Sequence, residues 1–198
     1  METAQVAGLV LAAGAGRRMG APKALARDAD GTAWVVRAVH ALTDGGCEPV
    51  LVVVGAAAAQ VMAELAGQPV EVVEAIDWQE GMGASLRAGL TALARHGGTA
   101  AALIVPVDVP SLCQDVVRRT AVGAGPDSLV RAVYHGSPGH PVLIGRDHWA
   151  EVAASAVGDK GARAYLATHP PYEIECADLA DGADVDTAEQ LPSGHRTG

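Results

Sequence analysis

The sequence predicts an α/β fold of three layers: a mostly parallel, doubly wound, Rossmann-like sheet with helices on both faces. Short apolar runs rich in Val, Leu and Ala, typical of strands buried on both faces, alternate with segments of helical periodicity. Aromatic residues make up only 3% of the 198 residues and Phe is absent, so the core must consist mainly of Ala, Val and Leu. Small side chains of this kind suit closely packed layers of helices on a sheet.

The first half of the chain contains four expected strands with helices between them. The strands cover residues 6–12, 50–55, 70–75 and 101–107, and the helices cover residues 34–42, 56–66, 85–95 and 111–121. In the third helix Leu86, Leu90 and Leu93 recur at i, i+4 and i+7 and therefore share one face. This alternation is typical of parallel strands joined by helices.

Shorter elements are expected after about residue 127. Two strands, 128–134 and 140–144, are joined by the turn-rich segment HGSPG; helices at 147–157 and 161–168 and a strand at 172–176 follow. The sequence shows no linker and no internal repeat, so we expect one domain over residues 1–198. The polar tail after Leu191 is expected to fray.

Charge and cysteine content exclude several classes of function. The formal net charge of −9 argues against binding to nucleic acid or to anionic membranes, because both need a basic face. Cys47, Cys113 and Cys176 form no CxxC pair, so we expect free thiols rather than a zinc site or a disulfide framework. The N-terminal segment lacks the basic region of a signal peptide and is too short for a membrane span, so a cytoplasmic protein is expected.

The loop after the first strand, LAAGAGRRMGAPK at residues 11–23, is the least ordinary part of the sequence. Ligands of open α/β sheets bind at the carboxyl ends of the strands, where this loop is expected to lie. Its three glycines permit close approach of backbone N–H groups to an anion; they are Gly14, Gly16 and Gly20. Four of the chain's fourteen basic residues fall within eleven positions, with no acid between them: Arg17, Arg18, Lys23 and Arg27. We interpret the loop as a cradle for a polyphosphate, against the alternative of a glycine-rich turn with solvated arginines.

Two familiar phosphate-binding motifs are excluded. A dinucleotide-binding GxGxxG would need glycine at position 19, where the chain has Met19. A Walker A loop needs lysine directly after its last glycine, whereas Ala21 and Pro22 separate Gly20 from Lys23.

Two aspartates are candidates for a metal site. Asp108 follows an apolar strand, where a carboxylate is costly without a cation nearby; the alternative is a helix N-cap, for which Ser111 is the better candidate. Asp186 lies in the segment DVDT, where a capping box from Asp186 to Glu189 explains the pattern almost equally well. The loop after the third strand, with Gly81 and Gly83, permits close backbone approach to a ligand, and Ser85 could cap the helix that follows.

The first loop resembles the signature LAxGxSxRMGxxK of the nucleotidyltransferases with a MobA-like fold. Arg18, Met19, Gly20 and Lys23 match it, whereas Gly16 stands where the family often has Ser. The AAG at 12–14 and the GMGASL at 81–86 are similar to the molybdenum cofactor cytidylyltransferase branch, and differ from the LAGG and GPLAG of the guanylyltransferase branch. The resemblance implies a nucleotide-diphospho-sugar transferase-like fold. It also implies Mg²⁺-dependent transfer of CMP from CTP to the phosphate of a molybdopterin-type cofactor, with release of pyrophosphate and with Mn²⁺ able to replace Mg²⁺.

The same resemblance implies a role for each motif. Lys23, Arg18 and Asp108 would be catalytic, and Asp108 and Asp186 would hold the metal. Nucleotide binding would fall to Leu11, Ala12, Ala13, Gly14, Gly16, Arg17, Lys23, Gly81, Met82, Gly83 and Ser85. Acceptor binding would fall to His140, Asp159, Lys160 and Arg163. A turn explains His140 equally well, and a helix start explains the other three equally well.

These roles divide the chain and suggest partners. Residues 1–125 would form the nucleotide-binding core, 126–190 the acceptor-binding part and 191–198 the tail. The expected ligands are a nucleotide triphosphate and a pterin-type cofactor, with a molybdenum hydroxylase apoenzyme as a further partner. Two alternatives stay open: transfer to another acceptor, such as a sugar or alcohol phosphate, or from another nucleotide; and a non-catalytic carrier or chaperone of the molybdenum cofactor.

Overall fold

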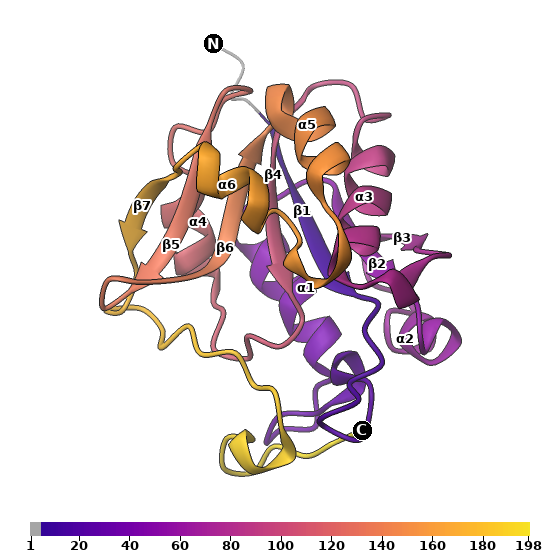
Figure 1. The fold of residues 1–198 in the computed structure, drawn as a ribbon. Coiled ribbons are helices and arrows are strands. Elements are labelled where there is room, and N and C mark those ends of the chain that lie inside the picture. Colours follow the sequence, from indigo (N-terminus) through magenta and orange to yellow (C-terminus); the bar gives the residue numbers. More distant parts are fainter. Residues whose placement is uncertain (1–4) are drawn as a thin grey trace.

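A computed structural model describes residues 5–198 and shows one seven-stranded sheet (Figure 1). The strand order is β3-β2-β1-β4-β6-β5-β7. The strands are β1 Gln5–Ala12, β2 Val50–Val54, β3 Glu71–Glu74, β4 Thr99–Pro106, β5 Leu129–Tyr134, β6 Ser137–Gly145 and β7 Tyr172–Glu175. Residues 1–4, part of the N-terminal segment for which no signal peptide was expected, lie outside the described residues.

The sheet is mostly parallel, as the sequence predicted. β1 pairs in parallel with β2 and with β4, so that Leu9 lies opposite Leu51 on one side and Ile104 on the other. β2 with β3 and β5 with β7 are also parallel, and only β6 runs antiparallel to its two neighbours, β4 and β5. The carboxyl ends of β1 and β4 therefore lie side by side at one edge.

Helices cover both faces of the sheet and complete three layers (Figure 1). Those that pack on one face are α1 Trp34–Asp44, α2 Ala58–Glu64 and α4 Gln114–Ala121. Those on the other are α3 Met82–Leu93, α5 Trp149–Ser155 and α6 Arg163–Thr168. Along each strand successive side chains enter opposite cores: Val10 faces α1, whereas Leu9 and Leu11 face α3. The expected α/β fold is confirmed.

Three expected helix caps are wrong. Ser111 does not cap α4, which begins at Gln114; its Oγ accepts a hydrogen bond from the N–H of Gly182 at 3.2 Å. α3 begins at Met82, so Ser85 is buried inside the helix instead of capping it. The capping box near the C-terminus joins Thr187 to Gln190, one position later than expected. Ser111 instead contacts a segment that is distant in the chain, and local sequence does not reveal such a contact.

The connection between β5 and β6 is shorter than the expected HGSPG turn. β6 already begins at Ser137, and the turn consists of His135 and Gly136, with φ angles of 51° and 75°. Two successive residues with positive φ are typical of the tight hairpin turn that fits twisted antiparallel strands.

The C-terminal tail packs against the body of the protein, which corrects the expectation that it frays. The indole Nε1 of buried Trp34 donates a hydrogen bond to Nδ1 of His195 at 3.2 Å. Arg27 and Arg196 exchange two backbone hydrogen bonds of 2.8 Å. The tail therefore lies along the segment that follows the glycine-rich loop. None of the helices in residues 5–198 is both long enough and apolar enough to cross a membrane.

Candidate active site

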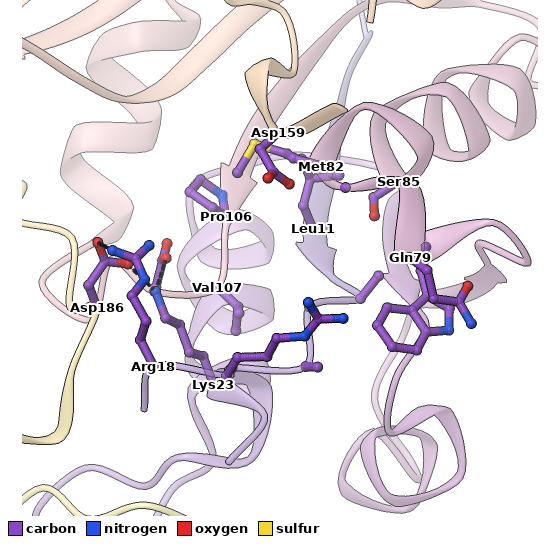
Figure 2. A pocket seen from close by; sticks show the side chains of 18 residues that line it. Leu11, Arg18, Lys23, Gln79, Met82, Ser85, Pro106, Val107, Asp159 and Asp186 are labelled. Atoms are coloured by element: carbon purple, nitrogen blue, oxygen red, sulfur yellow. Dashed lines mark hydrogen bonds and ion pairs between the residues drawn. The ribbon is translucent and has the colours of Figure 1, made fainter. Parts of the chain in front are cut away.

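A pocket of about 370 Å³ opens at the carboxyl ends of β1 and β4 (Figure 2). Most of the expected site residues line it: Leu11, Ala13, Gly14, Gly16, Arg17, Arg18, Lys23, Gly81, Met82, Ser85, Asp108, Asp159 and Asp186. Five further lining residues were not singled out in the sequence: Ala15, Trp78, Gln79, Pro106 and Val107.

The glycine-rich loop begins where β1 ends, and its turn is closed by its own backbone. The carbonyl of Gly16 accepts hydrogen bonds from the N–H groups of Met19 and Gly20 at 3.0 and 2.9 Å. The Met19 side chain is buried in the core and anchors the loop. Gly16 has a φ of 61°, and a Cβ there would overlap the carbonyl oxygen of Ala21. This conformation favours glycine, which stands here where the family signature has serine.

Lys23 lies at the centre of an ionic cluster at one end of the pocket (Figure 2). Its Nζ is 2.7 Å from Oδ2 of Asp108 and 2.7 Å from Oδ1 of Asp186. Arg18 Nη1 lies 3.1 Å from the other oxygen of Asp186, Oδ2. The side chains of Lys23 and Asp108 are mostly buried, at 16% and 18% exposed, so this contact is little screened by water.

Two features of the fold bring the aspartates together. Asp108 follows β4 by two residues and so stands beside the loop that leaves β1. The N–H of Val185 donates to the backbone carbonyl of Asp108 at 2.9 Å, which holds the DVDT segment next to it. The N–H of Asp186 donates to Oε1 of Gln190 at 2.8 Å, which fixes the orientation of that segment.

The cluster shifts the pKa values of its members. Burial alone would lower the pKa of Lys23, but hydrogen bonds to Asp108 and Asp186 and the charges of both carboxylates outweigh it and raise the pKa. The hydrogen bond from Lys23 lowers the pKa of Asp186, with a further contribution from Arg18. Burial raises the pKa of nearby Asp184, and the negative charges of Asp108 and Asp186 add to the effect. The site thus holds the ionised carboxylate of Asp186 beside the firmly charged ammonium group of Lys23.

The donor set fits a divalent cation of the magnesium type. Oδ1 of Asp108 is buried and has no hydrogen-bond partner among the described residues, so it is free to coordinate. Residues 5–198 contain no group of three or more His, Cys, Asp and Glu side chains that could hold a metal ion. Asp108 and Asp186 both contact Lys23 and so lie close together, and one or two carboxylates completed by phosphate oxygens and water are the usual ligands of Mg²⁺.

The opposite end of the pocket is formed by the loop that enters α3. Trp78 and Gln79 belong to a short 3-10 helix, Trp78–Glu80, and the Trp78 side chain packs so closely on Gly55 that a Cβ there would meet it at 2.7 Å. Gly81 has a φ of 110°, and a Cβ on it would overlap the carboxylate of Asp159. The glycines of this loop marked it in the sequence. The aromatic and amide side chains just before them, Trp78 and Gln79, were the signal that was missed for these two lining residues.

Five expected residues lie outside the pocket lining. Ala12 is buried in β1, and Gly83 packs against the backbone of Ala156. His140, Lys160 and Arg163 lie beyond the lining; the last two are exposed. Burial lowers the pKa of His140 to about 4, although the negative charge of Asp108 acts in the opposite direction, and Nδ1 of His140 has no partner among the described residues.

Comparison with known proteins identifies the family. Residues 8–173 match the model of the MobA-like NTP transferase domain. The chain belongs to this family. Its relatives include a nicotine blue oxidoreductase from Paenarthrobacter nicotinovorans, 38% identical over 94% of both chains. A probable molybdenum cofactor guanylyltransferase from Mycobacterium ulcerans is 31% identical over all of this chain and 96% of its own.

Solved structures agree with the family assignment. Rv0371c from Mycobacterium tuberculosis superimposes with a TM-score of 0.76 at 30% identity, over 96% of both chains. A structure of the same protein in complex with manganese gives a TM-score of 0.74 at 29% identity, over 93% of this chain and 95% of that one. A divalent metal therefore occurs in the structure of a relative of this nucleotidyltransferase-like chain.

Proposed function

We propose that this protein transfers CMP from CTP to the terminal phosphate of a molybdopterin-type cofactor and releases pyrophosphate. The observation that supports it most is the convergence of Lys23, Asp108 and Asp186 at one end of a pocket walled by the glycine-rich loop. Phosphoryl and nucleotidyl transfer need little covalent chemistry from the protein. They need positioning and neutralisation of charge, which this set of residues can supply.

In the proposed reaction an oxygen of the acceptor phosphate attacks the α-phosphorus of CTP. The bond from the α-phosphorus to the oxygen that bridges to the β-phosphorus breaks, and pyrophosphate leaves with that electron pair. The loop backbone from Gly14 to Gly16, with Arg17, binds the triphosphate. Lys23 and Arg18 stabilise the charge that grows on the α-phosphate oxygens. Mg²⁺, or Mn²⁺ in its place, would be held by Asp108 and Asp186 and would supply further neutralisation of phosphate charge.

The donor base is proposed to be cytosine. The segments AAG at 12–14 and GMGASL at 81–86 support this choice through their resemblance to the cytidylyltransferase branch. GTP is the competing donor, because the relative from Mycobacterium ulcerans is named a guanylyltransferase. Trp78, Gln79 and Ser85 line the pocket, and Figure 2 shows Gln79 and Ser85 at the end away from the ionic cluster, where the base would lie.

The acceptor is proposed to bind on the side of the pocket formed by residues 126–190, while residues 1–125 bind the nucleotide. Asp159 lines the pocket, and His140, Lys160 and Arg163 would contact the acceptor beyond its rim. The charge of Arg163 influences the pKa values of both His140 and Asp184, so it acts on the region next to Asp108. A cytoplasmic location and transfer of the product to a molybdenum hydroxylase apoenzyme complete the proposal.

A thermal-shift comparison tests the donor. We expect CTP with Mg²⁺ to raise the melting temperature more than GTP, ATP or UTP, because a ligand that binds only the folded state stabilises it. A larger rise in melting temperature with GTP would indicate that the donor base is guanine and not cytosine. No shift with any of the four nucleotides would argue for a non-catalytic carrier of the molybdenum cofactor instead.

A second candidate is an oxidoreductase activity, favoured by the relative named nicotine blue oxidoreductase. No cysteine of residues 5–198 lines the pocket, so electrons would have to come from a bound redox cofactor such as a nicotinamide dinucleotide. Bleaching of nicotine blue by the protein with NADH or NADPH, unaffected by Asp108→Ala, would support this candidate.

A further inference from the structure

We propose that Lys23 is an internal cation that closes the metal site until a polyphosphate draws its side chain away. The inference rests on the proposed function, because it concerns the carboxylates assigned to the metal. It adds an order of events: divalent metal binds the free protein weakly, and strong metal binding follows the arrival of the triphosphate.

Geometry makes the two cations mutually exclusive. The ammonium group of Lys23 lies 2.7 Å from one oxygen of each aspartate, which is hydrogen-bonding distance. A magnesium ion coordinated by the same two oxygens would lie about 2.1 Å from each. The space between the carboxylates holds either cation but not both, so Lys23 must move before the metal can bridge them.

The remaining oxygens leave little room for a metal to bind while Lys23 stays in place. Arg18 takes the second oxygen of Asp186 at 3.1 Å. Only Oδ1 of Asp108 has no hydrogen-bond partner among the described residues, and one carboxylate oxygen beside two positive side chains is a poor metal site. The carboxylate charges are thus already neutralised by the protein.

The same pocket supplies the means of release. Lys23 begins a short 3-10 helix at the end of the glycine-rich loop, and its flexible stem allows the ammonium group to move without the backbone. Arg17 and the loop glycines line the wall that would receive a triphosphate. Its oxygens offer Lys23 a stronger negative partner than the two carboxylates, and Lys23 then leaves them free. Coupling of this kind is reciprocal and typically about 5- to 150-fold.

Metal binding without nucleotide tests this directly, since phosphate oxygens then cannot act as ligands. Mn²⁺ is titrated into the full chain and the free ion is measured by electron paramagnetic resonance. We expect Lys23→Met to bind Mn²⁺ at least about tenfold more tightly than the wild type, and Lys23→Arg to stay as weak as the wild type. Arg95→Met is the matched control, because it removes a positive side chain that is exposed and lies outside the pocket lining. Equal affinity of Lys23→Met and the wild type would overturn the proposal.

A measurement on the wild type covers the case in which Lys23→Met fails to fold. With two lysines in the chain, selective ¹³C labelling of the lysine Cε gives two NMR signals. Inorganic tripolyphosphate alone should move the Lys23 signal, while Mg²⁺ alone at millimolar concentration should not. Movement with Mg²⁺ alone, or none with tripolyphosphate, contradicts the proposal. Neither measurement needs turnover. If they contradict the role of Lys23 while nucleotidyl transfer is intact, this inference fails and the proposed function stands.

Discussion

Nζ of Lys23 lies 2.7 Å from Oδ2 of Asp108, although 85 positions separate the two residues in the chain. The contact exists because β1 and β4 are parallel neighbours in the sheet, so the loops that leave their carboxyl ends meet. Asp186 joins them from the C-terminal segment, 163 positions away from Lys23. Three distant parts of the sequence thus form one charged cluster, and its chemistry leads to the following predictions.

Asp108→Ala should remove most nucleotidyl transfer while the protein stays folded. Loss of one such charge contact in a transition state typically costs about 3 kcal/mol, or on the order of a hundredfold in rate. Pyrophosphate release measures the effect. Asp115→Ala is the matched control, because that side chain is 58% exposed on α4 and lies outside the pocket lining. Near-wild-type turnover in Asp108→Ala would contradict the role given to this carboxylate.

Gly16→Ser should weaken nucleotide binding even though it restores the residue of the family signature. A side chain at this positive φ overlaps the carbonyl of Ala21, so the loop must change its conformation. We expect the affinity for CTP to fall by about tenfold or more, since strain of this kind costs about 1–3 kcal/mol. Calorimetric titration measures it. Gly97→Ser, where a Cβ meets nothing within 4 Å, should bind CTP like the wild type.

The partly buried His140 should make the protein less stable in acid. Its pKa is about 4 in the folded protein against 6.5 for the free side chain, so the unfolded chain takes up a proton first as the pH falls. The stability is fully present above pH 6.5 and is lost as the pH falls toward 4. Between about pH 7 and about pH 4.5 the wild type should lose roughly 2 kcal/mol more than His140→Gln in urea unfolding. Parallel pH profiles of the two proteins would show that His140 is not the cause.

Removal of residues 195–198 should destabilise the protein, because the tail is packed. The truncation breaks the hydrogen bond from Trp34 to His195 and the two backbone bonds between Arg27 and Arg196. We expect a loss of about 1–2 kcal/mol and a melting temperature lower by roughly 2–8 °C. Ser193→Ala, at an exposed position of the same tail, is the control. An unchanged melting temperature of the truncated chain would mean that the tail contacts add nothing.

Buried strands were predictable from the sequence because burial on both faces leaves a local signature. The strand predicted at residues 6–12 corresponds to β1 Gln5–Ala12, and the strand predicted at residues 50–55 corresponds to β2 Val50–Val54. The glycine-rich loop and Asp108 were likewise visible, since glycines and a carboxylate after an apolar strand are local features. Contacts between distant segments were not visible: Ser111 bonds to Gly182, and Trp34 bonds to His195. Trp78 and Gln79 line the pocket just before Gly81, and their place beside the glycines of this loop was the local signal for them.

One measurement tests the central claim most directly: pyrophosphate release by the wild type with CTP, a molybdopterin-type cofactor and Mg²⁺, repeated with GTP, ATP and UTP and with a chelator. The account predicts turnover that requires both the acceptor and the divalent metal, that is fastest with CTP, and that Asp108→Ala lowers on the order of a hundredfold. No pyrophosphate release with any of the four nucleotides, in Mg²⁺ or in Mn²⁺, would contradict it.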